Sequence, residues 1–365
     1  MRAVIDATPL LVRSAGVKNY LYYWIEHMRR AAGSDVIDTL PAMRRLGGLQ
    51  HETSVTGRLR TFRGIGAMLF SNMMPLPVMD FRVGRADLFH ASVLVRRPPR
   101  RTPLTATLYD MTCYLMPEVH TEANIVAEQH FAKTLRRARG IIAISESTRN
   151  DAIRILGLPP EKMEVIYPGV APAFFDCPLE AADAVRRRYG LDKPFVLYVG
   201  TIEPRKNVDL LLDAFAALPA EVRAAWELVI AGSVGWNAER TMERLRAARY
   251  LGYVPEPDLA PLTKAASVFA YPSLYEGFGL PAAQALAAGT PLITSNVSSL
   301  PEVGGDAAIL VDPRSESELR SALLRLLTDS EGRAHAADAG RKIADRFRWE
   351  ECAARSLHFF RRIAG

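Results

Sequence analysis

The stretch PFVLYVGTIEPRKNVDLLLDAFAAL, residues 194–218, places an apolar run, a polar loop and a helical repeat in direct succession. PFVLYVG is short, β-branched and aromatic, which is typical of a buried strand. VDLLLDAFAAL repeats its apolar residues at helical spacing. A strand that leads through a short loop into a helix is the repeating unit of a parallel α/β sheet. The stretch therefore predicts an α/β fold, with Arg205 and Lys206 in the loop at the carboxyl end of a strand.

The same alternation continues on both sides of this stretch. At 365 residues, the chain exceeds one typical hydrophobic core, which favours two domains. Residues 164–180, EVIYPGVAPAFFDCPLE, are rich in proline and have no sustained period, so we expect a linker there. Ligands of such domains bind beyond the carboxyl ends of the strands and in the cleft between the domains. Further strands are expected at ADLFHAS, TPLTATLYD and GIIAIS before the linker, and at WELVIAG, RYLGYV, SVFAYPS, PLITSN and AAILVDP after it.

The composition indicates a soluble globular protein, because 49% of the residues are apolar and 24% are charged. Asp6 interrupts the first apolar run, which argues against a secretory signal, and no apolar span is long enough to cross a membrane. The cysteines at 113, 177 and 352 are odd in number and form no C-x-x-C pair. We expect reduced thiols in a cytoplasmic protein.

The net charge of +6 is concentrated in the front of the chain. Residues 1–175 hold 23 basic and 15 acidic side chains, whereas the remainder holds 23 and 25. Five arginines between 44 and 63 precede an apolar segment that includes Phe70. This pattern suits the surface of an anionic membrane, and equally a solvated face with a small core of its own. No nucleic-acid-binding motif accompanies the charge, so we do not expect a nucleic acid partner.

The loop TIEPRKN carries two adjacent cations at a strand's carboxyl end. Arg205 offers a planar fork of donors and Lys206 a mobile point charge, so together they can clamp a diphosphate. The alternative is a solvated turn in which Asn207 caps the next helix.

The loop SLYEGFGLP leads into a helix whose first turn should hold Pro281. Gly277 and Gly279 let the backbone approach a ligand, and the unpaired amides of the helix start suit a phosphate. Glu276 would repel a phosphate, so it fits better as an acceptor for sugar hydroxyl groups. The alternative is a glycine-rich turn with an exposed glutamate.

Together these motifs resemble the retaining glycosyltransferases of family 4, and among them bacterial mannosyltransferases that build surface polysaccharides. The likeness rests on YVGTIEPRKNVDLLLDAF, LVIAGSVGW, LGYVPEPDL, YPSLYEGFGLPAAQALAAGTPLITSNVSSLPEVGGDAAILVDP and FRWEECAA, and in the front half on IDATPL, AGVKNY, TLYDMTCYLMPEVH and IIAISESTRNDAIRILGLPPEKMEVIYPGV. It implies the GT-B fold, in which two Rossmann-like doubly wound domains face a central cleft. We therefore expect an acceptor domain over 1–175, a nucleotide-sugar domain over 176–345, and a helix over 346–365 that crosses back to the first domain.

The resemblance also implies roles for particular residues. Arg205 and Lys206 would hold the donor diphosphate, Glu276 would bind the transferred sugar, and Gln284 stands where the family has an acid that binds the ribose. The expected catalytic residues are Arg205, Lys206 and Glu276, the expected donor-binding residues are Gly200, Thr201, Gly232, Tyr253, Val254, Gly277, Phe278, Gly279, Leu280 and Gln284, and the expected acceptor or cleft residues are Gly16, Val17, Tyr109, Asp110 and His120.

Two positions depart from the family pattern. Gln284 can still accept a hydroxyl proton, but it loses the charge-assisted bond, so we expect weaker or altered ribose binding. Tyr109 stands where the family usually has a histidine near the reacting sugar. His90 and His120 are other front-half histidines, and for each a structural role is the simpler interpretation.

The resemblance implies a metal-independent, retaining transfer of a hexose from a nucleotide diphosphate to a glycan or lipid-linked acceptor, with no cofactor. Mannose from GDP-mannose is the first donor to test. The protein would be cytoplasmic and could bind the inner face of the membrane. Two alternatives stay open: a non-catalytic family member that binds a nucleotide sugar or a partner protein, which Tyr109 and Gln284 suggest, and a GT-B nucleotide-sugar epimerase.

Overall fold

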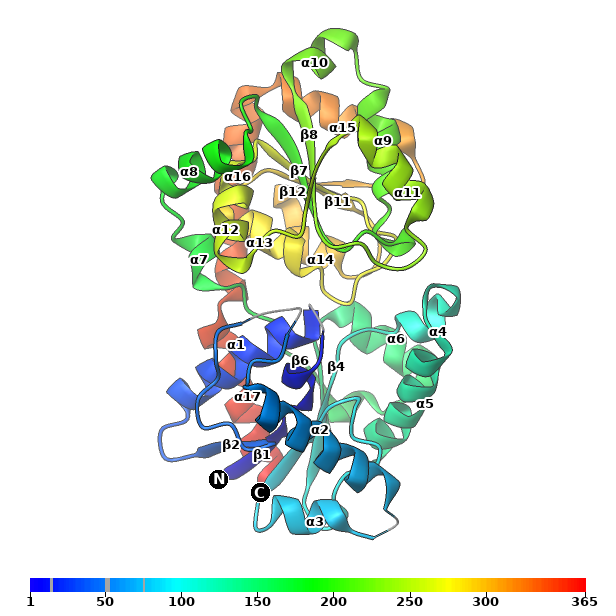
Figure 1. The fold of residues 1–365 in the computed structure, drawn as a ribbon, viewed down its shortest axis with the longest axis vertical. Helices are drawn as coiled ribbons and strands as arrows, with labels where there is room; N and C mark the ends of the chain where they lie inside the picture. The colour runs from blue at the N-terminus through cyan, green and yellow to red at the C-terminus, as the bar shows by residue number, and fades with distance from the viewer. Residues whose placement is uncertain (14–15, 50–52, 75) are drawn as a thin grey trace. The chain divides into compact units, whose positions relative to one another are not determined.

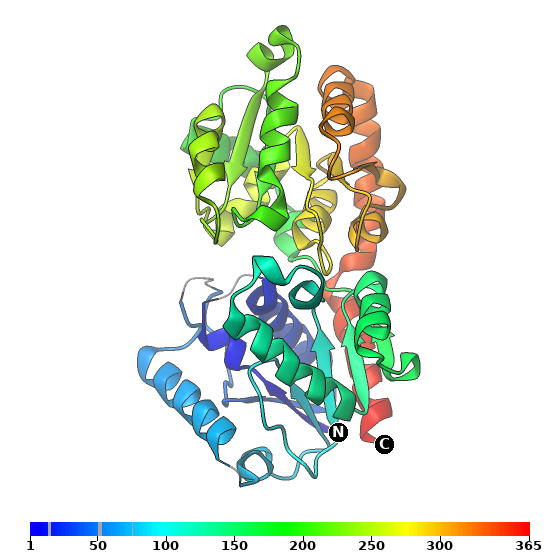
Figure 2. The ribbon, with the colours of Figure 1, turned by 90° about the vertical axis from the view of Figure 1, so that its right-hand side faces the viewer.

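The computed structural model describes residues 1–13, 16–49, 53–74 and 76–365. The chain forms two compact units. The first unit consists of Met1–Gly169 together with Trp349–Gly365, and the second unit is Val170–Arg348. In each unit a parallel sheet is flanked by helices (Figures 1 and 2). The α/β fold class predicted from the sequence is therefore confirmed.

The sheet of the first unit has its strands in the order β2-β1-β3-β4-β5-β6, and every described pair is parallel. The central strands β3, β4 and β5 are buried along their whole length, because helices cover both faces of the sheet. The strands are β1 (Arg2–Asp6), β2 (Val36–Leu40), β3 (Leu88–Ala91), β4 (Leu104–Leu108), β5 (Gly140–Ala143) and β6 (Met163–Val165).

The last helix of the chain packs on the first helix of the first unit. The indole Nε1 of Trp24 donates to Ser356 Oγ at 2.8 Å, and the rings of Trp24 and Phe360 lie edge to face at 5.8 Å. Apolar side chains at helical spacing on both helices account for this contact. The helices of this unit are α1 (Gly16–Ala31), α2 (Arg58–Met73), α3 (Val78–Val83), α4 (Thr112–Leu115), α5 (Glu122–Arg137), α6 (Glu146–Leu156) and α17 (Trp349–Ala364).

The sheet of the second unit repeats this parallel design in the order β12-β11-β10-β7-β8-β9. Its strands are β7 (Phe195–Val199), β8 (Glu227–Ala231), β9 (Arg249–Gly252), β10 (Val268–Tyr271), β11 (Leu292–Ser295) and β12 (Ala308–Val311). Its helices are α7 (Pro172–Phe175), α8 (Leu179–Tyr189), α9 (Val208–Ala216), α10 (Ala220–Ala225), α11 (Glu239–Arg244), α12 (Glu256–Ala265), α13 (Leu280–Ala288), α14 (Leu300–Gly304), α15 (Glu316–Thr328) and α16 (Ser330–Ala344).

Two strands escaped the sequence prediction, and both lie at an edge of the first sheet. β2 contains Asp38 and exposes Val36, so it lacks the continuous apolar run of a central strand. β6 has three residues, and its last two fall inside the segment that we expected to be a linker. An edge strand is covered on fewer sides than a central one, so its sequence is less apolar and harder to detect.

Among the described residues, no helix is both long enough and apolar enough to cross a bilayer.

Candidate active site

Two neighbouring strands of the second unit bring the candidate site residues together. β7 and β10 pair in parallel, so their carboxyl ends meet at the same edge of the sheet. A short 3₁₀ helix, η4 (Pro204–Lys206), follows β7, and the loop of residues 272–279 follows β10. The backbone N–H of Leu274 donates to Arg205 O at 2.9 Å, which joins the two loops.

Four charged side chains and a tyrosine form one connected group between these loops, which we call the ion cluster. Lys206 Nζ lies 2.6 Å from Glu276 Oε1 and 2.7 Å from the hydroxyl of Tyr271. Arg205 lies 3.1 Å from Glu276 Oε2 and donates to Glu203 Oε1 at 2.6 Å. Tyr271 completes the group by donating its hydroxyl proton to Glu276 at 2.9 Å. The cluster therefore has two cations against two carboxylates.

Burial decides between the two interpretations of these loops. The side chains of Arg205 and Lys206 are 14% and 12% exposed, and Glu276 is 7% exposed. The alternatives of a solvated turn and of an exposed glutamate are therefore wrong. Both cations are held by specific partners in a region with little water, where an electrostatic contact is strong.

Backbone contacts fix the position of the glutamate. The N–H of Glu276 donates to Ser298 Oγ at 3.0 Å, and Ser299 Oγ donates to Glu276 O at 2.9 Å. Arg205 also donates to the carbonyl of Tyr275 at 2.7 Å. Because the main chain is anchored on both sides of the carboxylate, the side chain is preorganised.

Burial and the neighbouring charges shift the pKa values of three members of the ion cluster. Burial alone would raise the pKa of Glu276, because it disfavours the charged carboxylate. Together, the neighbouring cations Lys206 and Arg205 have the larger effect and lower this pKa to about 2. Burial and the adjacent Arg205 lower the pKa of Lys206, while Glu276 opposes that change. Burial, together with Glu276, raises the pKa of Tyr271 well above its usual value. At neutral pH, Glu276 is thus a carboxylate and Tyr271 a neutral phenol.

The start of α13 follows Glu276 closely. Gly279 precedes the helix at φ 89°, a left-handed conformation that favours glycine, and a Cβ there would also come within 2.6 Å of Leu300 Cδ2. Pro281 occupies the first turn, which confirms the sequence prediction. Phe278 is buried and packs edge to face against Phe347 at 5.3 Å. The positive end of the helix is therefore fixed beside the ion cluster, where it favours an anion.

The strand ends next to the cluster approach each other closely. A Cβ on Gly232, which has φ 149°, would come within 1.8 Å of Gly200 O, so only glycine fits after β8. Gly200 N–H donates to Ala231 O at 3.0 Å. Of the other expected donor-binding residues, Thr201 is half-buried two residues after β7, Tyr253 is 45% exposed after β9 and Val254 is buried.

Gln284 lies on α13, whose alanines and Leu286 are buried. Gln284 itself is half-buried, and it stands one helical turn after Leu280, which is also half-buried. Residues four apart share one face of a helix, so Leu280 and Gln284 lie on the accessible face of α13. No described contact ties down the Gln284 amide, so it can accept a hydrogen bond from a ligand.

The expected acceptor residues belong to the first unit, and two of them open its first helix. Gly16 is exposed and begins α1, and Val17 is half-buried. Residues 14–15, part of the loop predicted to approach the ligand, lie outside the described residues.

The other three expected acceptor residues follow β4. The ring of Tyr109 packs edge to face on Tyr20 of α1 at 5.3 Å. Asp110 and His120 are both half-buried. Asp110 accepts from the hydroxyl of Thr112 at 2.6 Å, and His120 ends a short 3₁₀ turn.

His90 is a buried residue of β3 rather than a candidate acid or base. Its Nδ1 lies 3.0 Å from Thr105 Oγ1, and its Nε2 lies 3.0 Å from Thr107 Oγ1. Burial lowers the pKa of His90 to about 3, so the ring is neutral at physiological pH. Both ring nitrogens have partners in the protein, which agrees with the expected structural role.

The sequence did not identify every contact around the ion cluster. Glu203 stands two residues before Arg205, but nothing in the spacing shows that the two side chains meet. Tyr271 ends a buried strand, where an aromatic side chain is expected in the core. Asn207 stands directly before α9, but its side chain does not cap that helix, so this prediction was wrong. Its backbone is left-handed at φ 58°, and its amide donates to Pro272 O and Pro313 O, which ties loops together instead.

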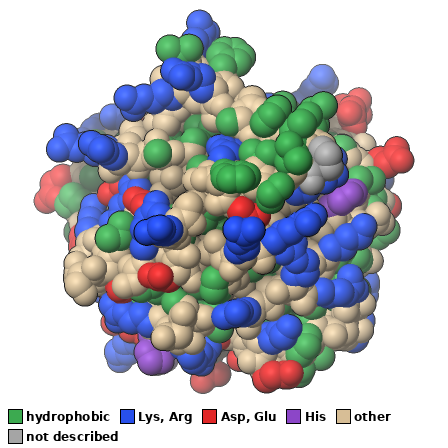
Figure 3. Space-filling view, turned by 90° about the horizontal axis from the view of Figure 1, so that it is seen from below, with side chains coloured by type: hydrophobic (Ala, Val, Ile, Leu, Met, Phe, Trp, Pro, Cys, Tyr) green, Lys and Arg blue, Asp and Glu red, His purple; other side chains and the backbone are tan. Residues whose placement is uncertain are grey.

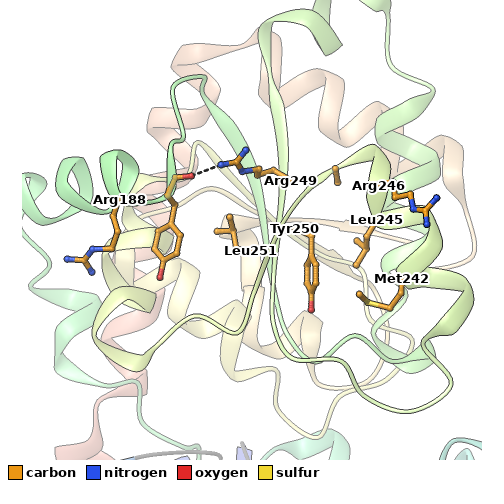
Figure 4. A pocket seen from close by; sticks show the side chains of 9 residues that line it. Arg188, Met242, Leu245, Arg246, Arg249, Tyr250 and Leu251 are labelled. Carbon is orange, nitrogen blue, oxygen red and sulfur yellow. Dashed lines mark hydrogen bonds between the residues drawn. The ribbon is translucent and has the colours of Figure 1, made fainter.

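A separate pocket of about 650 Å³ lies at the edge strand β9 (Figure 4). Its walls include Arg188, Arg246 and Arg249, and Arg249 donates to Tyr189 O at 3.0 Å. No member of the ion cluster lines this pocket. Within the described part of the chain, no group of three or more His, Cys, Asp or Glu side chains is placed to hold a metal ion.

Comparisons with known proteins match both units of the chain. Residues 14–174 match the family model "Glycosyltransferase Family 4", and residues 182–343 match "Glycosyl transferases group 1". The O-antigen chain mannosyltransferase B of Escherichia coli is 32% identical over 272 residues, which cover 72% of this chain and 71% of that protein. The serotype-specific mannosyltransferase WbdA of E. coli is 28% identical over 84% of this chain, but the chain spans only 39% of WbdA.

Solved structures match the fold over nearly the whole chain. Sucrose-phosphate synthase from Thermosynechococcus elongatus has a TM-score of 0.75 at 22% identity, with 99% of this chain and 98% of that chain covered. HepE from Anabaena, solved with UDP and glucose, has a TM-score of 0.73 at 18% identity, with 98% of both chains covered. The fold is GT-B, and the protein is a glycosyltransferase. More specifically, the chain belongs to glycosyltransferase family 4.

Proposed function

We propose that this enzyme is a retaining mannosyltransferase that moves mannose from GDP-mannose to a hydroxyl group of a polysaccharide or lipid-linked glycan. The ion cluster beside the start of α13 carries the proposal, because it offers cations for a diphosphate and a carboxylate for a sugar. The choice of mannose follows the names of the E. coli relatives, which are mannosyltransferases.

The cations suit a diphosphate leaving group. Arg205 and Lys206 are only 14% and 12% exposed, so a diphosphate bound there would meet both charges with little competition from water. Charge that develops on the leaving oxygen as the sugar bond breaks would be stabilised by these cations and by the amides of the helix start. The ion cluster has no net charge, because its two cations face two carboxylates. The positive end of α13 therefore adds the positive potential that a bound diphosphate needs.

Glu276 would exchange its partners when the donor binds. In the structure its two oxygens face Lys206 and Arg205. Once a diphosphate shares those cations, the carboxylate can accept hydrogen bonds from sugar hydroxyls. Ser298 and Ser299 hold its backbone in place through this exchange.

The reaction is a same-face displacement. The acceptor oxygen forms a bond to the anomeric carbon on the face from which the diphosphate leaves. The electron pair of the broken bond passes to the phosphate oxygen, which then takes the proton of the acceptor hydroxyl. This chemistry depends on orientation and leaving-group stabilisation rather than on a protein base. In this proposal Arg205, Lys206 and the start of α13 hold the diphosphate without a metal or cofactor, and the reaction is compatible with a tyrosine at 109.

We place the reaction in the cytoplasm. Cys113, Cys177 and Cys352 are all free thiols, which suits a reducing compartment. Burial raises the pKa of Cys352 to about 12, so this thiol is a packed, unreactive side chain.

A panel of nucleotide sugars tests the proposal. GDP-mannose, GDP-glucose and UDP-glucose separate the preference for the sugar from the preference for the base, with free nucleotide and glycan product as readouts. We expect turnover with GDP-mannose, an α-linked product by NMR, and full activity in EDTA. Turnover with UDP-glucose alone would overturn the donor assignment, and an inverted product would overturn the retaining mechanism.

A second function is a nucleotide-sugar-binding protein without transferase activity, which Gln284 and Tyr109 favour because both depart from the family pattern. A thermal shift with GDP-mannose that occurs without nucleotide release in the presence of acceptor glycan would support this function. Measurable transfer would exclude it.

A further inference from the structure

Helix α2 of the first unit buries small residues and exposes most of its large apolar side chains. The only described residues of the helix that are fully buried are small, namely Gly64 and Ser71. A Cβ on Gly64 would lie 2.6 Å from Leu11 Cδ1, so the helix sits close against its support. Ser71 Oγ donates to Ala67 O and accepts from Arg82 at 2.8 Å, which fixes the far end. The helix therefore packs against the protein mainly through small residues, with Ile65 and Met68 half-buried beside them.

Most of the large apolar side chains on α2 and in the segment that follows it are exposed. On the helix, their spacing of three, four or seven residues places most of them along one side. Half of the fourteen large exposed apolar side chains among the described residues fall within residues 59–81. We call this set the apolar stripe: Leu59 (71% exposed), Phe62 (74%), Leu69 (51%), Phe70 (54%), Met73 (72%), Leu76 (64%) and Phe81 (82%).

A groove rich in arginine lies beside α2. A groove of about 790 Å³ runs beside α2, and five arginines line it together with Leu11, Met43 and Ala67. Seen from below, hydrophobic side chains gather on this face among many lysine and arginine side chains (Figure 3). We call this feature the arginine groove; its arginines are Arg44, Arg45, Arg60, Arg63 and Arg82.

The charge of this region is strongly one-sided. Residues 41–101 contain eleven arginines and three carboxylates, for a net charge of +8. Arg82 is held in place by Ala67 O at 3.0 Å and by Ser71. The other four arginines of the groove are exposed, and no ion pair joins any of them to an acidic side chain within the described residues. The groove therefore presents four cations whose counter-ions the described chain does not supply.

We propose that α2 and the arginine groove form a docking surface for an anionic phospholipid bilayer. The apolar stripe would enter the boundary between headgroups and acyl chains, with the helix axis parallel to the membrane. The arginines of the adjacent groove would contact the lipid phosphates. A helix of 16 residues is about 24 Å long, so the stripe can make several insertions at once.

The combination of side chains favours a bilayer over other anionic partners. A nucleic acid would match the arginines but would leave Leu59, Leu69 and Met73 in water, since it offers no aliphatic surface. A bilayer supplies phosphates directly beside hydrocarbon, just as the groove lies directly beside the stripe. A bilayer therefore differs from a nucleic acid in one testable way: its binding should depend on the apolar stripe as well as on the arginines.

Vesicle flotation with the full-length protein tests the proposal. We expect the protein to float with vesicles of phosphatidylglycerol and phosphatidylcholine, and to remain at the bottom with phosphatidylcholine alone. The double variant Phe62→Ser/Met73→Ser should bind at least about tenfold more weakly, because it removes two insertions from the stripe. Arg60→Ala/Arg63→Ala should bind about thirtyfold more weakly, at about fivefold for each arginine near the surface. The matched controls are Leu179→Ser and Arg187→Ala, which alter exposed residues of the second unit.

A second measurement reports insertion directly. Phe62→Trp should gain fluorescence quenching by brominated lipids, whereas Leu179→Trp should not. Nucleotide release with a soluble acceptor should stay unchanged in every α2 variant, which separates this proposal from the proposed transferase activity. The docking surface is overturned if anionic vesicles do not retain the wild type, if the stripe variant floats like the wild type, or if an acidic protein competes while the stripe is dispensable.

Discussion

The two units hold their charges in opposite ways. In the second unit, Arg205 and Lys206 are buried and each contacts a carboxylate at 2.6 Å. In the first unit, four arginines of the groove lie at the surface. The carboxylates differ as well. Burial, together with Asp110, raises the pKa of Glu128 to about 8, whereas the pKa of Glu276 is lowered to about 2.

This contrast separates two kinds of recognition. A buried cluster with fixed partners is selective, because a ligand must replace known contacts at known positions. An exposed group of arginines attracts any anionic surface, and salt weakens that attraction. Under our two proposals, the second unit selects one small ligand, and the first attaches to an extended anionic surface.

The largest effect should come from Lys206→Ala. The variant removes one of two cations from the leaving group, and a lost donor of this kind costs about 100-fold or more in turnover. Nucleotide release from GDP-mannose measures it. Lys264→Ala is the control, since Lys264 is a part-buried lysine of the same unit that donates to Ala288 O outside the cluster. Wild-type turnover in a folded Lys206→Ala protein would exclude the diphosphate assignment.

Salt should affect the two regions differently. Raising the ionic strength from about 0.1 to about 0.5 M shortens the screening length and should weaken vesicle binding by about tenfold or more. The KM for GDP-mannose should change much less, because the ion cluster is buried. Vesicle flotation and initial rates at the same salt concentrations compare the two. If vesicle binding and the KM for GDP-mannose depended equally on salt, the two regions would not differ in how salt screens their charges.

Gln284→Glu should have a moderate effect. A charge-assisted bond to a ribose hydroxyl is roughly twice as strong as a neutral one, so the KM for the donor should fall by about fivefold. The expected change is in KM, with kcat nearly constant, because ribose is remote from the reacting carbon. Initial rates over a range of donor concentrations separate the two constants.

The matched control for this variant is Gln129→Glu. It makes the same substitution at an exposed glutamine of α5 in the first unit, so it adds the same charge away from the donor site. We expect its KM for the donor to equal that of the wild type. An unchanged KM in Gln284→Glu would place Gln284 outside the ribose site.

The smallest effect should be that of Glu128→Gln on stability. The pKa of Glu128 is about 8 in the folded protein and about 4.5 when unfolded, so the folded state holds an extra proton between these values. Wild-type stability should therefore fall as pH rises from 4.5 to 8, by roughly 1 kcal/mol for this half-buried group. The variant should lose less stability over that range.

Thermal unfolding at pH 5 and pH 8.5 measures this difference. Glu122→Gln changes an exposed glutamate of the same helix and should behave like the wild type. A parallel pH dependence in wild type and Glu128→Gln would show that Glu128 does not carry the extra proton.

In the first sheet, the sequence predicted the central strands better than the edges, whereas both edge strands of the second sheet, β9 and β12, were predicted. PFVLYVG, SVFAYPS and GIIAIS are continuous apolar runs because helices bury both faces of those strands. A strand that is buried on both faces can therefore be recognised from its sequence alone. The edge strands β2 and β6 were missed because their surroundings demand fewer apolar residues.

The candidate site was predictable only in part. Arg205, Lys206 and Glu276 follow adjacent strands, so the order of the motifs indicated that they could meet. The partners Glu203 and Tyr271 could not be predicted, because contacts between loops depend on how each chain segment turns after its strand.

By itself, the sequence determined the alternation of strands and helices, the glycines and proline that open α13, and the excess of positive charge in the front of the chain. These properties are local, since they depend on periodicity, on backbone conformation and on side-chain type. Only the tertiary structure decided that Glu276 is a buried partner of two cations and that α2 exposes most of its large apolar side chains. Both depend on which face of a segment meets the rest of the protein, and a segment's own sequence does not specify what lies against it.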